Sequence, residues 1–150
     1  MTRHTTKSLS ETLKLGKKLA SSFAKAMADK LSFNTNVVGL IGDLGSGKTA
    51  FVKGVGKYFK IENITSPTFV VMKIYKIKNN KKYTNLVHID CYRFEDYESL
   101  VDIGIEEYIN DEKSLVLIEW ADKIKGSLPK TTKYIKFKLG KKENERIINT

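Results

Sequence analysis

Residues near the start of the chain recur at steps of three and four, which lines one face of a helix. Ser8, followed three positions later by Glu11, forms a capping box at the start of this segment. The pattern predicts a helix that packs on the core through Leu9, Leu13, Gly16, Ala20, Phe23 and Met27.

Two short apolar runs, residues 37–41 and residues 114–119, are typical of strands buried on both faces of a parallel sheet. A helix is predicted over residues 50–59 and another over residues 100–109. Strands over residues 68–77 and 83–90 are predicted to form a hairpin around the polar turn at residues 78–82. Residues 134–139 alternate as in an edge strand, with which residues 146–148 are expected to pair. Strands mixed with helices predict an α/β domain.

The length and composition narrow the class of protein. A chain of 150 residues with 41% hydrophobic residues is expected to form one domain over residues 1–150, with residues 1–7 flexible. Its single cysteine excludes a disulfide framework and a multi-cysteine zinc site. No apolar stretch approaches the ~18 residues that span a bilayer. We expect no secretory signal, because the Lys-rich start of the chain has no continuous apolar segment. We therefore expect a cytoplasmic protein that does not bind membranes.

The charge of the chain is unevenly distributed. The net charge is +10, yet residues 90–112 hold nine acidic residues and one arginine, a local charge of −8, so the remainder carries +18. Of the 27 basic residues, 24 are lysines, which favours the effect of an AT-rich genome over a dedicated nucleic-acid surface. The acidic segment indicates a patch suited to a basic partner.

The strongest motif is the P-loop pattern G-x-x-x-x-G-K-T at residues 42–49, between a buried strand and a helix. Its glycines let successive backbone N–H groups face phosphate oxygens at a helix N-terminus. Lys48 is expected to reach the β- and γ-phosphates, and Thr49 to offer its hydroxyl to Mg²⁺. The motif predicts a nucleotide site in a P-loop NTPase fold, with a mostly parallel central sheet, an antiparallel hairpin and edge strands, and flanking helices.

A P-loop requires a carboxylate at the end of a neighbouring strand. Two apolar runs end in one, the first at Asp90 and the second at Glu119. Either acid is a candidate to orient the attacking water, and the sequence does not decide between them. Trp120 follows Glu119 directly. It is a candidate either for a core position or for a gating or partner role.

Polar residues between these motifs are further candidates. The segment Thr65, Ser66, Pro67 and Thr68 has hydroxyls that are able to sense a γ-phosphate, although an ordinary capped turn fits equally well. His88 is expected to be a packing residue, with an acid–base role as the alternative. Arg93 either contacts phosphate or pairs with neighbouring acids.

Taken together, the motifs resemble the bacterial TsaE family. They occur in its order and approximate spacing over about residues 8–148: the P-loop, TSPTF at 65–69, HIDCYR at 88–93, GIEEY at 104–108 and IEW at 118–120. The absence of Asn-Lys-x-Asp and of a downstream Asp-x-x-Gly sets the chain apart from GTPases.

The resemblance implies slow ATP hydrolysis, activated by the two TsaD- and TsaB-like subunits that transfer the carbamoyl group to position 37 of tRNA. It implies Thr49 and Glu119 near Mg²⁺ and Asp90 in hydrolysis, and it places the helix start with Thr12 near the nucleotide base. Arg146, in a segment that only loosely matches the family, is a further nucleotide-contact candidate. With these, the expected nucleotide-binding residues are Thr12, Gly42, Asp43, Leu44, Gly45, Ser46, Gly47, Lys48, Thr49, Ala50 and Arg146.

Two other functions remain open at this point. The charge of +10 fits a nucleotide-gated module that binds tRNA directly. A P-loop also fits a small-molecule kinase, although the chain has few arginines to place against a transferring phosphoryl group.

Overall fold

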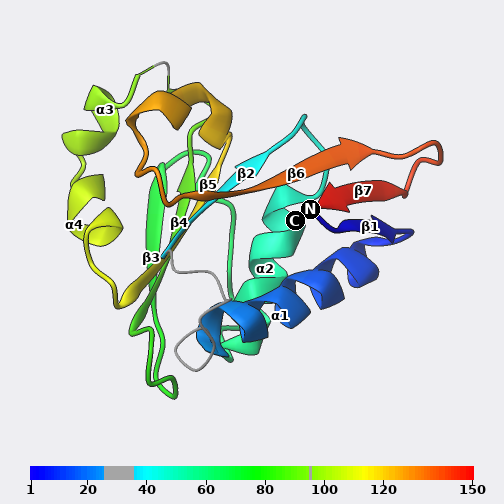
Figure 1. Ribbon diagram of the computed structural model, residues 1–150, viewed down its shortest axis with the longest axis horizontal. Helices are drawn as coiled ribbons and strands as arrows, with labels where there is room; N and C mark the ends of the chain where they lie inside the picture. Colours follow the sequence, from blue (N-terminus) through cyan, green and yellow to red (C-terminus); the bar gives the residue numbers. More distant parts are fainter. Residues whose placement is uncertain (26–35, 95) are drawn as a thin grey trace.

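The computed structural model describes residues 1–25, 36–94 and 96–150. Within these ranges seven strands form one sheet in the order β1-β7-β6-β2-β5-β4-β3 (Figure 1). The strands are β1 (Arg3–Thr6), β2 (Val37–Ile41), β3 (Met72–Lys76), β4 (Asn85–Asp90), β5 (Ser114–Glu119), β6 (Lys133–Leu139) and β7 (Arg146–Asn149). The helices are α1 (Leu9–Lys25), α2 (Lys48–Tyr58), α3 (Glu98–Val101), α4 (Ile105–Ile109) and the 3-10 helix η1 (Ala121–Ser127). None of these helices is long and apolar enough to cross a bilayer.

The four central strands β6, β2, β5 and β4 run parallel, and the outer strands pair antiparallel. Every residue of β4 and β5 is buried, because helices cover both faces of the sheet here. The α/β class, the parallel centre and the antiparallel β3–β4 hairpin are confirmed. In the β4–β5 register Asp90 lies directly opposite Glu119, so both acids stand at one end of the sheet.

Helices α1 and α2 cover one face of the sheet, while α3, α4 and η1 cover the other (Figure 1). Leu117 and Phe51 belong to the core cluster on the first face, and Ile118 and Ile105 to the cluster on the second. The alternation of side chains along β5 therefore supplies both cores.

Helix α1 lies against α2 through two glycines. A Cβ on Gly16 would stand 2.3 Å from the carbonyl oxygen of Phe51, and one on Gly54 would stand 2.1 Å from that of Leu13. This close approach brings the first turn of α1 to the P-loop. The predicted capping contact is present, since the Glu11 N–H donates to the Ser8 hydroxyl at 3.2 Å.

The predicted face of α1 is partly correct. Ala20 and Phe23 are buried, whereas Leu9 is exposed and the buried Leu15 was not expected. Met27 lies outside the described residues.

The boundaries of two predicted elements were wrong. Strand β3 begins at Met72, because residues 67–71 form a turn in which the N–H groups of Val70 and Val71 donate to the carbonyl of Pro67. The single helix expected over residues 100–109 is two short helices, α3 and α4, separated at Gly104, whose φ of 83° breaks the helix.

Two expectations about the sheet edge also differ from the structure. Strand β6 is not an edge strand: it lies between β2 and β7. Its alternation arises because one of its faces packs on the core and the other meets solvent. Residues 1–7, expected to be flexible, include strand β1, which pairs with β7 from Arg3 to Thr6.

Candidate nucleotide site

The turn between β2 and α2 has the conformation that its glycines allow. Gly42 and Gly47 have φ values of 152° and 102°, which side-chain-bearing residues rarely adopt. A Cβ on Gly42 would also stand 2.3 Å from the carbonyl oxygen of Phe137 in β6. The loop between these glycines therefore bends tightly against the neighbouring strand and delivers Lys48 and Thr49 to the first turn of α2.

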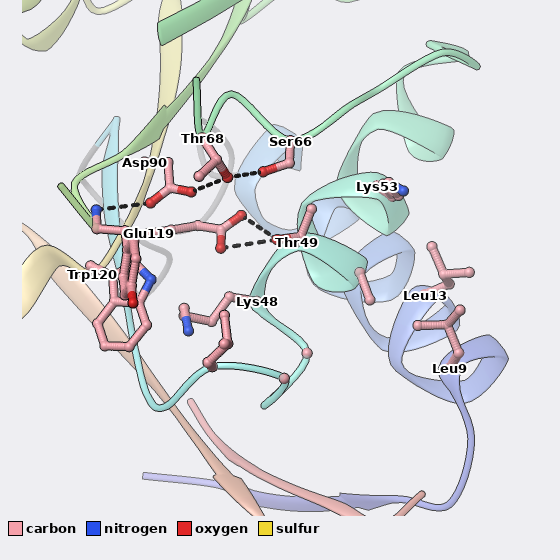
Figure 2. A pocket seen from close by; sticks show the side chains of 15 residues that line it. Leu9, Leu13, Lys48, Thr49, Lys53, Ser66, Thr68, Asp90, Glu119 and Trp120 are labelled. Carbon is pink, nitrogen blue, oxygen red and sulfur yellow. Dashed lines mark hydrogen bonds between the residues drawn. The ribbon is translucent and has the colours of Figure 1, made fainter. Parts of the chain in front are cut away.

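A pocket opens over this turn (Figure 2). It is bounded by the P-loop and α2, by the start of α1, by the segment before β3, and by the ends of β4 and β5. Its lining residues are Leu9, Leu13, Leu44, Gly45, Gly47, Lys48, Thr49, Ala50, Lys53, Ser66, Thr68, Asp90, Tyr92, Glu119 and Trp120. Lys53 and Tyr92 are lining residues that the sequence analysis did not single out. Leu9 and Leu13 also line the pocket, although the helical pattern predicted that they pack on the core.

The Lys48 ammonium is held at the base of the loop. Nζ donates to the carbonyl oxygens of Gly42 at 2.6 Å and Asp43 at 2.9 Å, and it lies 4.2 Å from the centre of the Trp120 ring. Burial lowers its pKa below the usual 10.5, and the charges of Glu119 and Asp90 oppose that shift. The ammonium therefore faces the loop through two charge-assisted hydrogen bonds to its carbonyl groups.

The two strand-end acids lie on the same side of the pocket and have different partners (Figure 2). The Thr49 hydroxyl donates toward Glu119 Oε1 at 2.8 Å and Oε2 at 3.0 Å. Asp90 accepts a hydrogen bond from the Thr68 hydroxyl at Oδ2, at 2.8 Å, and one from the Tyr92 N–H at Oδ1, at 2.9 Å. Glu119 thus faces the P-loop and Asp90 faces the segment before β3.

The donor set at Thr49 and Glu119 suits a hard cation. Within the described ranges no group of three or more His, Cys, Asp or Glu side chains is placed to hold a metal ion. Mg²⁺ is ordinarily bound by one or two carboxylates together with substrate phosphates. A hydroxyl and a carboxylate oxygen 2.8 Å apart beside a P-loop fit that pattern.

The segment Thr65–Thr68 reaches the pocket through two of its hydroxyls. Ser66 and Thr68 share a hydrogen bond of 2.6 Å, and Thr68 continues it to Asp90. Thr65 instead accepts a hydrogen bond from Lys73 on β3, and Pro67 accepts the turn hydrogen bonds described above. Only Ser66 and Thr68 of this segment line the pocket.

Thr12 and Arg146 come from distant parts of the chain and meet the P-loop from its outer side. Arg146 Nε donates to the Gly45 carbonyl at 2.8 Å, and a Cβ on Gly47 would lie 3.3 Å from the Thr12 methyl and 3.8 Å from Arg146 Cγ. Neither side chain lines the pocket. In this structure both support the loop, and a nucleotide contact by either remains a prediction.

The remaining predicted residues differ in their exposure and in whether they line the pocket. Asp43 is exposed, whereas Ser46 is buried and its hydroxyl has no partner within the described part of the chain. Trp120 lines the pocket and its ring lies 5.1 Å from that of Tyr92. Arg93 lies outside, with its guanidinium 4.9 Å from the centre of the exposed Phe69 ring.

His88, for which the sequence predicts packing with an acid–base role as the alternative, contacts a site residue. Its Nε2 lies 2.8 Å from Glu119 Oε1. The alternation of strand residues carried the necessary signal, because His88 lies two positions before Asp90 and shares its face of β4.

Comparison with known proteins identifies the family. A family model described as "Threonylcarbamoyl adenosine biosynthesis protein TsaE" matches residues 6–148. The chain belongs to the TsaE family. The resemblance drawn from the motifs is thereby confirmed.

Curated relatives of this TsaE-family chain carry the name "tRNA threonylcarbamoyladenosine biosynthesis protein TsaE". The protein from Rickettsia typhi is 43% identical over 110 residues, which are 72% of each chain. The protein from Haemophilus influenzae is 37% identical over 118 residues, which are 78% of this chain and 69% of the relative. The crystal structure of Bacillus subtilis YdiB superposes with a TM-score of 0.70 at 30% identity, over 98% of this chain and 82% of that one. This likeness confirms the fold.

Proposed function

We propose that this chain is the Mg²⁺-dependent, ATP-binding and ATP-hydrolysing subunit in the biosynthesis of threonylcarbamoyladenosine at position 37 of tRNA. Membership of the TsaE family supports the pathway. One observation carries the ATPase proposal: the Thr49 hydroxyl is hydrogen-bonded to the Glu119 carboxylate at the mouth of a P-loop. Such a pair, beside a P-loop, is suited to bind a nucleoside triphosphate together with a divalent cation.

In the proposed mechanism the backbone N–H groups of residues 43–49 surround the phosphates. Lys48 exchanges its two carbonyl partners for β- and γ-phosphate oxygens, which stabilises charge that develops in the transition state. Thr49 and Glu119 would hold Mg²⁺, which neutralises charge on the β- and γ-oxygens. The intrinsic rate is slow, because the chain has only three arginines and none lines the described pocket.

We assign the attacking water to Asp90. Its carboxylate lies beside Glu119 but is bonded to Thr68 and not to the P-loop. Water attacks the γ-phosphorus, the bond to the β–γ bridging oxygen breaks, and ADP and inorganic phosphate leave. The water proton passes to solvent or to a phosphate oxygen, and Asp90 orients the water during this step.

The proposal is tested by measuring phosphate release and nucleotide affinity at increasing Mg²⁺. Thr49→Val removes the hydroxyl at nearly constant shape, and Thr49→Ser is the matched control that keeps it. We expect the valine variant to lose Mg²⁺-stimulated turnover by about 100-fold or more, as for other essential groups in a transition state. Serine should retain most of the turnover. Wild-type protein that binds no ATP in the presence of Mg²⁺ would overturn the proposal.

We further propose that the surface beside Thr68 contacts the two carbamoyl-transfer subunits. Phe69 and Val70 are 83% and 59% exposed, and the Arg93 guanidinium lies over the Phe69 ring. Exposed apolar residues next to a charged group are typical of the centre of a protein interface. Since Thr68 bonds to Asp90, this surface is linked to the proposed catalytic acid.

Pull-down with the TsaD- and TsaB-like subunits tests this surface, in ATP, in ADP and without nucleotide. Phe69→Ala should weaken capture, whereas Leu139→Ala, at another exposed apolar residue on β6, should not. Equal capture by both variants would remove this surface from the interface. Capture that is independent of nucleotide would remove the switch role of residues 65–68.

Direct binding of tRNA is a second candidate that one observation favours. Arg3 and Lys136 are both paired with Asn149 in the β1-β7-β6 part of the sheet, so they share one exposed side with Lys138. A basic sheet face of this kind suits a phosphate backbone. Tight binding of tRNA by the isolated chain, falling steeply with salt, would support this function.

A further inference from the structure

The ring of His88 is wholly buried in β4 and makes a single hydrogen bond within the described ranges. Nε2 lies 2.8 Å from Oε1 of Glu119, and Nδ1 has no partner there. A carboxylate only accepts hydrogen bonds, so the hydrogen of this contact is on Nε2. The ring therefore has one polar contact, and that contact is with a residue of the proposed metal site.

The sheet register explains how the ring reaches Glu119. His88 pairs with Leu117, and Asp90 pairs with Glu119, so all four side chains point to the α2 face of the sheet. His88 thus lies two residues before the pocket residue Asp90, on the same face of the central strand β4. Side chains on central strands are held more rigidly than side chains on loops, which suits a positioning role.

Packing alone does not account for a histidine at this position. Its neighbours on the same face, Leu86 and Leu115, are wholly buried and apolar. An imidazole among them costs stability, because Nδ1 loses its water and gains no partner. The bond to Glu119 is the contact that compensates for this cost.

The two oxygens of Glu119 are held differently. Oε1 faces both His88 Nε2 and the Thr49 hydroxyl, at 2.8 Å each, whereas Oε2 has, among the described residues, only the Thr49 hydroxyl at 3.0 Å. Under the proposed function, on which this inference rests, the Thr49 oxygen turns to Mg²⁺ when the nucleotide binds. The hydrogen bond from Thr49 to Glu119 then weakens, whereas the hydrogen bond from His88 to Glu119 is kept.

We propose that His88 is a positioning residue for Glu119. Its Nε2–H fixes Oε1 and leaves Oε2 directed at the Mg²⁺ site, so that the carboxylate keeps its place when Thr49 changes partner. Partners of this type, behind a metal-binding side chain, ordinarily contribute 10–100-fold to metal affinity or activity.

Three variants test this role. His88→Leu removes the donor, and His88→Gln keeps an N–H donor close to the position of Nε2. Val87→Ala is the control for loss of packing, because Val87 is equally buried on β4 but belongs to the cluster on the opposite face of the sheet. For each we would measure the melting temperature, the affinity for a fluorescent ATP analogue with Mg²⁺ and with EDTA, and kcat and KM for hydrolysis.

For His88→Leu we expect unchanged affinity in EDTA, a loss of about 10-fold in the affinity gained from Mg²⁺, and a fall of about 10–100-fold in kcat with little change in KM. His88→Gln should recover most of both losses. Val87→Ala should lower the melting temperature without changing the Mg²⁺ response. If His88→Leu does not fold, His88→Asn replaces it, since its shorter amide does not reach Glu119.

Two results would overturn the inference while leaving the proposed function intact. One is a folded His88→Leu variant with the Mg²⁺ response and kcat of the wild type. The other is a His88→Gln variant as impaired as His88→Leu at the same melting temperature. Wild-type protein without Mg²⁺-dependent ATP binding would instead overturn the proposed function, and this inference with it.

Discussion

The Thr49 hydroxyl and the Glu119 carboxylate are hydrogen-bonded to each other, at 2.8 and 3.0 Å, although 70 positions separate them in the chain. Thr49 lies in the first turn of helix α2, and Glu119 ends strand β5. Helix α2 follows the neighbouring parallel strand β2, so the sheet brings the two together at the carboxyl ends of its strands. Open α/β sheets place their ligands at this end.

Replacing Lys48 by alanine should weaken ATP binding by about 10–100-fold, because charge-assisted hydrogen bonds to phosphate contribute about 1.5–3 kcal/mol. Isothermal titration calorimetry with ATP and Mg²⁺ measures the loss. Lys57→Ala, in the exposed last turn of the same helix, is the control and should bind normally. Equal affinities of Lys48→Ala and wild type would contradict the assignment of Lys48 to the phosphates.

Substitutions of Glu119 and Asp90 are expected to have different effects on Mg²⁺ dependence and on kcat. Glu119→Gln should reduce the dependence of ATP affinity on Mg²⁺ and lower kcat, because Glu119 is hydrogen-bonded to Thr49, with which it is proposed to hold Mg²⁺. Asp90→Asn should lower kcat by about 100-fold or more and leave that dependence unchanged. Single-turnover phosphate release and Mg²⁺ titrations distinguish the two variants. An identical pattern in both would contradict separate roles.

Tyr83→Phe should stabilise the protein. The Tyr83 side chain is wholly buried, and its hydroxyl has no hydrogen-bond partner in the described part of the chain. Removing this hydroxyl should raise the free energy of unfolding at pH 7 by about 1 kcal/mol, within the usual cost of an unpaired buried polar group. Urea titration measures the change, and a loss of more than about 1 kcal/mol would show that the hydroxyl is satisfied.

The same tyrosine predicts a pH effect. Burial raises the pKa of Tyr83 from 10.0 to about 12, so between these values the unfolded chain has lost the proton and the folded chain has kept it. The unfolded state then binds fewer protons, and the free energy of unfolding falls as pH rises from 10 to 12. Tyr83→Phe should make this fall shallower. Cys91, whose pKa burial raises from 9.0 to about 12, should continue to contribute to it.

Substituting Gly54 tests the contact between α1 and α2. The alanine Cβ would stand 2.1 Å from the Leu13 carbonyl oxygen, and backbone must move to relieve that contact. We expect Gly54→Ala to lower the free energy of unfolding by about 1–3 kcal/mol and to weaken nucleotide binding, since α1 borders the pocket. Gly126→Ala, with no atom within 4 Å of its new Cβ, should do neither.

The sequence predicted the residues that line the site better than it predicted their hydrogen-bond partners. A P-loop between a strand and a helix, followed by strands ending in Asp90 and Glu119, predicted side chains that do line one pocket. The partners of these side chains were harder to predict. The bond from His88 to Glu119 depends on sheet register, and that from Arg146 to Gly45 depends on long-range topology. Local alternation places His88 on the same face of its strand as Asp90, but no local pattern identifies the partner in either bond.

Element boundaries failed where tertiary structure overrides a local pattern. The apolar run after Pro67 reads as a strand, but its first residues form the turn that exposes Phe69. The alternation of residues 134–139 predicts an edge strand, but one open face of an interior strand produces the same alternation. Periodicity reports which side of a strand is buried, not how many neighbours the strand has.

The support of the P-loop by Arg146, 101 positions after Gly45, has a consequence for synthesis on the ribosome. A nascent chain that has emerged as far as Glu119 already contains the loop, the lysine and both acids. It still lacks β6, which packs against Gly42, and β7, which begins with the arginine. The P-loop and its charged residues are therefore translated early, but the strands that support the loop are translated later. The loop has all its contacts only after translation has extended through β7.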